Sequence, residues 1–124
     1  MPFASRTKIL SWTHHAQVKM RFYKLSQERV RRVLHSPARI EEGVAPKTVA
    51  MMQPASIKTS AIGRAGAKKD GTWTQEIWVM VQDAGHNRKV ISAWRYPGVT
   101  KPRDAVAMNF AQQEYREFAA KEKD

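Results

Sequence analysis

Residues 73–96 carry the feature that most constrains how this chain can fold. In the run Trp73 to Gln82, the apolar residues of segment 77–82 (Ile-Trp-Val-Met-Val-Gln) point alternately to two sides, which is typical of a β-strand with apolar weight on both faces. A turn follows at 83–87, and Lys89 to Tyr96 forms the partner strand before Pro97-Gly98 ends it. The sequence therefore predicts a hairpin at the centre of a sheet.

Two short helices are predicted before this hairpin, after a strand at 8–12. Thr13 and Ser26 are suited to cap helices at 14–24 and 27–35, because a hydroxyl can accept a hydrogen bond from a free amide of the first turn. Three residues of the first helix share a face by their spacing and are expected in the core: Ala16, Met20 and Tyr23.

The remaining segments complete the order β-α-α-β-β-β-α. A strand is predicted at 48–53 and a flexible basic loop at about 55–72. The last helix should span 103–121 with a buried stripe of Met108, Ala111, Tyr115 and Phe118. Residues 1–124 thus predict a single α+β domain, with a small antiparallel sheet, two N-terminal helices packed on one side, and a C-terminal helix.

Composition narrows the classes of function. The formal net charge is +11, and residues 1–40 hold nine lysines and arginines against one acid, a field that attracts phosphate backbones. The absence of cysteine excludes a disulfide scaffold, a cysteine-ligated zinc site and a thiol nucleophile. Without an apolar run of membrane-spanning length or a signal-peptide core, we expect a cytoplasmic protein with no membrane partner.

RNA is the expected partner of the basic segment. The alternatives are a solvated, solubilising surface and, ranked below both, contact with an anionic membrane. The residues predicted to bind nucleic acid lie in the first forty positions and in the basic loop: Lys19, Arg21, Lys24, Arg31, Arg32, Arg39, Lys68 and Lys69.

Two stretches resemble known families. His15-Ala16-x-x-Lys19-Met20, with Leu25-Ser26, Val30, Leu34 and Pro37 after it, resembles the opening of a bacterial domain family of unknown function whose fold is placed with the RelE/ParE toxins. Lys89-Val-Ile-Ser-Ala-Trp-Arg95, followed by a charged helix with Tyr115, resembles the closing segment of BrnT toxins. The resemblance implies a RelE-like fold, metal-free ribonuclease activity on translated mRNA, and a cognate antitoxin. Lys24 stands where such families usually have a glycine.

Metal-free RNA cleavage requires a base, an acid and cations, and the sequence offers a candidate for each. His15 is the candidate base or acid, Arg95 the cation that could fork two phosphate oxygens, and Lys89 a second cation on the same strand face. Tyr115 could donate a proton or stack on a base. The carboxylates are scattered, so no metal site or other cofactor is predicted.

Each of these residues also has a structural interpretation. His15 could bond the backbone and pack on Trp12, Arg95 could pair with an acid of the last helix, and Tyr115 could be a core aromatic. Two hypotheses therefore stand. The first is a metal-independent endoribonuclease toxin of a toxin–antitoxin system, acting on ribosome-bound mRNA. The second is a non-catalytic protein of the same fold that binds RNA or the ribosome through rRNA.

Overall fold

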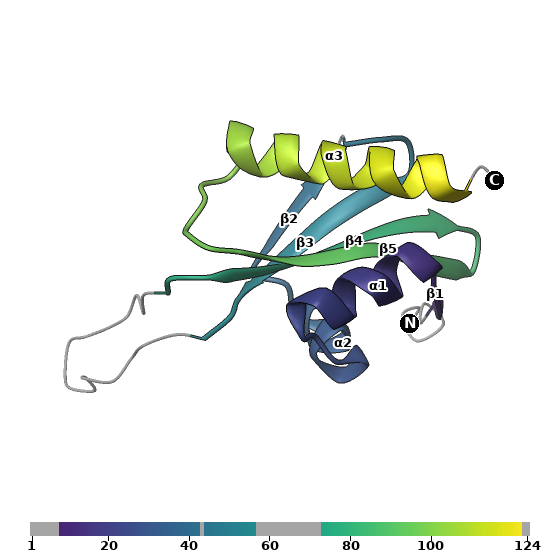
Figure 1. Cartoon of the computed structure of the whole chain (residues 1–124), viewed down its shortest axis with the longest axis horizontal. Coiled ribbons are helices and arrows are strands. Elements are labelled where there is room, and N and C mark those ends of the chain that lie inside the picture. The colour runs from purple at the N-terminus through teal and green to yellow at the C-terminus, as the bar shows by residue number, and fades with distance from the viewer. Residues whose placement is uncertain (1–7, 43, 57–72, 123–124) are drawn as a thin grey trace, which may run out of the picture.

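A five-stranded sheet forms the middle layer of the computed structural model, which describes residues 8–42, 44–56 and 73–122. Its strands lie in the order β1-β5-β4-β3-β2 (Figure 1). The central hairpin is the one that the alternating apolar pattern predicts. The strands are β1 (Ile9–Trp12), β2 (Arg39–Glu42), β3 (Thr48–Pro54), β4 (Glu76–Ala84) and β5 (Asn87–Tyr96).

Helices cover both faces of the sheet. Helices α1 (His14–Tyr23) and α2 (Gln27–His35) lie on one side and α3 (Ala105–Glu122) on the other (Figure 1), which confirms the predicted α+β class. The two predicted N-caps are also confirmed, since Thr13 accepts from the amide of Ala16 and Ser26 from that of Arg29. None of the helices in the described ranges has both the length and the apolar character that crossing a membrane requires.

The sheet differs from the predicted one at its two edges. Strand β2 pairs antiparallel with β3 and is not predicted from the sequence. Its segment, Arg-Ile-Glu-Glu, has too little alternation of apolar and polar residues to indicate a strand. Strand β1 pairs parallel with β5, so the sheet is mixed rather than wholly antiparallel. Directly after β1, Thr13 donates its hydroxyl hydrogen to the carbonyl of Val90 at 3.1 Å, and α1 then packs against β5 through Ala16 and Met20.

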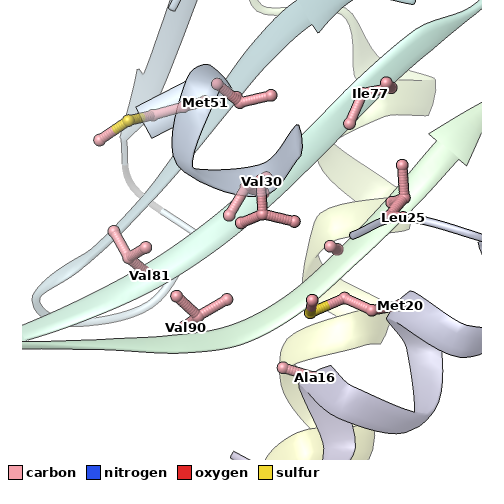
Figure 2. Packing of buried hydrophobic residues seen from close by; sticks show 11 residues of the cluster. Ala16, Met20, Leu25, Val30, Met51, Ile77, Val81 and Val90 are labelled. Carbon is pink, nitrogen blue, oxygen red and sulfur yellow. The ribbon is translucent and has the colours of Figure 1, made fainter. Parts of the chain in front are cut away.

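Two hydrophobic clusters hold the layers together. The first lies between the sheet and the N-terminal helices, where Ala16 and Met20 of α1 and Val30 of α2 gather over Val81 and Val90 (Figure 2). The second lies under α3 and contains Trp78 and Trp94, whose rings stack with centroids 6.2 Å apart. These tryptophans are packing residues, and Tyr23 touches both clusters from the last turn of α1.

A β-bulge in β5 changes which residues share a face. Met80 pairs with Ser92 but Val81 pairs with Val90, so Ile91 is an extra residue in the ladder. The register on either side of the bulge then places Lys89 on the α3 side, whereas Arg95 reaches α1 on the opposite side. The prediction that these two cations share a face is therefore wrong, because simple alternation takes no account of an inserted residue.

Helix α3 begins two residues later than predicted and buries a different stripe. The carboxylate of Asp104 accepts hydrogen bonds from the amides of Val106 and Ala107, so it caps the helix. The buried residues are Ala107, Ala111, Glu114 and Phe118, whereas Met108 and Tyr115 are only half-buried. A search for apolar residues at helical spacing passes over Glu114, whose burial depends on partners from α1 and β5.

Candidate nucleic-acid interface

Two arginines from different layers are held at the turn between α1 and α2. Arg29, in the first turn of α2, donates to the side-chain carbonyl of Gln53 at 2.7 Å and to the backbone carbonyl of Pro54 at 3.2 Å. Arg95, near the end of β5, donates to the carbonyls of Tyr23 at 2.8 Å and Lys24 at 3.4 Å. Arg95 thus meets the negative end of the α1 dipole, rather than an acid of the last helix.

Arg32 and Arg95 each lie near enough to Arg29 for their charges to act on it, and we call Arg29, Arg32 and Arg95 the arginine cluster. Burial, together with the positive charges of Arg32 and Arg95, lowers the pKa of Arg29 from its ordinary value. Since a guanidinium stays protonated at neutral pH, the effect of this crowding is a concentration of positive charge rather than a loss of it.

The charge of the arginine cluster is not neutralised within the described part of the chain. The acceptors that orient Arg29 and Arg95 are amide or backbone carbonyls. No carboxylate of residues 8–42, 44–56 or 73–122 comes within 4.0 Å of its guanidinium nitrogens. Each guanidinium has about five N–H donors, so donors remain for an external anion.

The turn itself has an unusual backbone. Lys24 follows α1 with a φ of 58°, in the left-handed conformation that glycine adopts most readily, at the position where the resembling families usually have a glycine. Its amide returns to the carbonyls of Arg21 and Met20 and closes the helix. The chain therefore reverses within a few residues, which brings the end of α1 and the first turn of α2 to the same place.

Some of the other residues predicted to bind nucleic acid are exposed, and others are engaged in ion pairs within the protein. Arg21, Lys24, Arg31 and Arg32 are exposed, and the guanidinium of Arg31 lies 5.5 Å from the ring centroid of Trp12. Lys19 and Arg39 are engaged internally, as described below. Lys68 and Lys69 lie outside the described residues, as does the predicted loop beyond residue 56.

Arg39 belongs to a network around a fully buried carboxylate. Its guanidinium bonds Thr100, pairs with Glu41 at 3.4 Å and lies over the ring of Trp78. The carboxylate is that of Glu76, which accepts from the hydroxyl and amide of Thr100 and from two indole nitrogens. Arg39 is therefore held by the segment that leads into α3, and its role here is internal.

His15 lies inside a second network, between α1, β5 and α3. Its side chain is 1% exposed, and Nε2 lies 3.1 Å from Oε1 of Glu114. The same oxygen accepts from the hydroxyl of Ser92 at 2.6 Å. Because that oxygen is an acceptor, Nε2 carries the hydrogen, and Nδ1 is buried without a partner among the described residues. His15 thus bonds a side chain of α3 rather than the backbone, and an RNA substrate has no access to its ring in this arrangement.

Lys19 completes this network from the solvent side. Its ammonium lies 3.1 Å from Glu114 and 3.6 Å from Glu117. Burial lowers the pKa of Lys19, but the hydrogen bond and charge of Glu114 outweigh it, and the net shift is upward. His15, Glu114 and Glu117 bring potential metal-ligand atoms within 4.8 Å of one another. The ammonium of Lys19 already places a positive charge against both of these carboxylates. The absence of a metal site stays a prediction from the sequence.

The four residues predicted as catalytic are not brought together. His15 lies in the first turn of α1 while Arg95 binds the end of that helix, and the eight steps from His15 to Tyr23 correspond to about 12 Å of helix rise. Lys89 is exposed on the other face of the sheet. Tyr115 packs against the second cluster, 6.0 Å from the ring of Phe118. The structure instead places Arg95 near Arg29.

Arg29 and Glu114 are not predicted from the sequence, for different reasons. In the sequence, Arg29 resembles the other outward-facing arginines of α2, and only the structure shows that Gln53 and Pro54 of β3 hold its guanidinium. Glu114 has a detectable signal, since it lies three residues after Ala111 and four before Phe118 on the buried line.

Comparison of the chain with protein-family models, curated proteins and solved structures finds no match in any of the three. The resemblance to RelE/ParE and BrnT toxins therefore stays a prediction from the two sequence stretches.

Proposed function

We propose that this protein binds RNA through its phosphate backbone, with the arginine cluster as the central contact. The observation that carries the proposal is that Arg29 and Arg95 are oriented by neutral carbonyls. Guanidinium groups fixed in this way keep their full charge for a ligand, and their geometry suits phosphate oxygens. Arg21, Lys24 and Arg31 are further exposed cations of α1, of the turn after it and of α2.

The contrast with the other cations supports this site. Arg39, Arg88 and Lys19 are each paired with a carboxylate, whereas the arginine cluster is not. A surface that only keeps the protein soluble would not require some cations to be paired with carboxylates and others to be held unpaired, because exposed charges keep a protein soluble whether or not their side chains are ordered. Cleavage of the bound RNA and pairing with an antitoxin are further proposals that rest on the sequence resemblance alone.

The test is a salt titration with matched double variants. Arg32→Gln/Arg95→Gln removes two charges from the arginine cluster, and Arg116→Gln/Lys121→Gln removes two exposed charges from α3, on the other face of the sheet. Binding of a fluorescent single-stranded RNA is followed by anisotropy from low to moderate salt. Each phosphate that the protein no longer neutralises should reduce the slope of log K against log salt by about 0.7.

We expect the slope of the cluster variant to be smaller than that of the wild type by about 1.4, and the α3 variant to behave like the wild type. Equal reductions in both variants would show that the net charge, not the arginine cluster, drives binding.

Because Arg95 also closes the end of α1, thermal unfolding of each variant is measured first. Arg32→Gln alone serves as the variant whose side chain makes no hydrogen bond within the described ranges. The same samples, run on a denaturing gel, show whether the RNA is cut and test the nuclease proposal.

A further inference from the structure

Phe22 is the most exposed of the large hydrophobic side chains in the described ranges, at 73%. It lies in the last turn of α1, one residue before Tyr23, whose carbonyl holds Arg95. Its ring meets the ring of Tyr23 edge to face, with centroids 4.8 Å apart and an interplanar angle of 86°. The ring therefore has a neighbour that limits its orientation, while most of its surface faces solvent.

The surroundings of Phe22 are cationic rather than apolar. Arg21 and Lys24, on either side of the Phe22–Tyr23 pair in sequence, are both exposed. Arg95 lies close by: standard backbone dimensions limit its Nε to about 9 Å from the Cα of Phe22. One nucleotide spans such a separation between its phosphate and its base. A protein partner that covered Phe22 would have to bring acidic side chains to balance these cations, whereas RNA brings its own negative charge.

We infer that Phe22 is a stacking surface for a base of single-stranded RNA whose phosphate lies on the arginine cluster. This inference rests on the proposed function and narrows it from RNA in general to single strands. In a duplex the bases are stacked on each other and are not available to an aromatic side chain, whereas an unpaired base can stack on one. Phe22 supplies the aromatic face, and the cations beside it hold the backbone.

The test separates stacking from charge and from apolar contact. Three ligands of about 12 units are compared: a single-stranded RNA, the same RNA in a duplex, and an abasic phosphodiester that keeps the phosphates but has no bases. The variants are Phe22→Leu, which keeps an apolar side chain without an aromatic face, and Phe22→Trp, which enlarges that face. Val106→Ala removes apolar surface from α3, where Val106 is 56% exposed, and serves as the control.

We expect Phe22→Leu to weaken binding of the single-stranded RNA by about five- to a hundredfold, with the salt slope unchanged. Phe22→Trp should bind at least as tightly as the wild type. Neither variant should change binding of the abasic ligand, and Val106→Ala should change nothing. The wild type should prefer the single strand to the duplex.

Several results would overturn the inference. A Phe22→Leu protein that binds single-stranded RNA like the wild type, or a wild type that binds duplex equally well, would contradict it while leaving the arginine cluster in place. Equal weakening for the RNA and the abasic ligand would assign the effect to charge or folding. A dimer in gel filtration that dissociates on Phe22→Leu would show that a second copy covers Phe22. If the Arg32→Gln/Arg95→Gln variant binds RNA normally, the proposed function itself fails.

Discussion

Replacing Glu114 should destabilise this protein more than any change of an exposed acid on the same helix. Its carboxylate is 4% exposed and takes hydrogen bonds from Ser92, His15 and Lys19. In Glu114→Ala, the donors of Ser92 and His15 stay buried without an acceptor, at about 1–3 kcal/mol each. Lys19 can turn to Glu117, which is 40% exposed, and thereby recovers part of its interaction. We expect a net loss of about 3–5 kcal/mol in the free energy of unfolding.

Urea unfolding at pH 7 measures this loss. For a domain of this size the expected change is a fall of roughly 2–3 M in the midpoint, with the slope unchanged. Glu114→Gln, which keeps an oxygen for Ser92 and His15 but turns an amide toward Lys19, should lose about 1–3 kcal/mol. Glu117→Ala is the matched control on the next turn, and as a half-exposed ion-pair partner it should lose less than about 1 kcal/mol.

The reasoning fails if Glu114→Ala and Glu117→Ala are equally stable. Such a result would mean that water or a side-chain movement satisfies His15 and Ser92 at little cost. A double-mutant cycle between Lys19→Met and Glu114→Gln then isolates the pair itself, and a coupling energy near zero would show that the ammonium contributes no stability to the network.

Two further predictions concern the other carboxylates. Glu76→Ala leaves the indole nitrogen of Trp78 and the amide and hydroxyl of Thr100 without their acceptor, so we expect a loss of about 3–5 kcal/mol in urea unfolding; a loss below about 1 kcal/mol would contradict the role of this network. The hydrogen bond from Arg88 lowers the pKa of Asp83 below its ordinary value of 3.8, and burial opposes this effect. The Asp83 carboxylate therefore stabilises the folded state above pH 3.8, and this contribution is lost as the pH falls below that value. Asp83→Asn should therefore cost no more than about 1 kcal/mol at pH 7 in this screened surface pair, with no difference left near pH 2; a difference that persists in acid would assign the effect to packing.

Much of the fold follows from local patterns. The hairpin is visible as alternating apolar residues, and the starts of α1 and α2 follow from the hydroxyls of Thr13 and Ser26. The inward positions of Ala16 and Met20 follow from helical spacing. These features depend on interactions within a few residues, which is why a single sequence is enough to predict them.

The candidate sites were only partly predictable for the opposite reason. The sequence marks Arg95 and Arg32 as cations, but the partners of Arg95 are carbonyls more than seventy positions away in the chain. The bulge that places Lys89 and Arg95 on opposite faces of the sheet cannot be recognised from the pattern of apolar residues. The sequence marks His15 as a titratable group at a helix start, whereas its surroundings come from Ser92 and Glu114.

The sequence by itself determined the class of the domain, its main helices and strands, and the excess of positive charge near its N-terminus. Only the tertiary structure decided which charges are neutralised. Glu114 and Glu76 are buried and paired. Arg32 and Arg95 instead lie near Arg29, and none of the three arginines pairs with a carboxylate among the described residues. The physical reason is that electrostatic interaction depends on distance and burial in space, and neither quantity is encoded in local sequence.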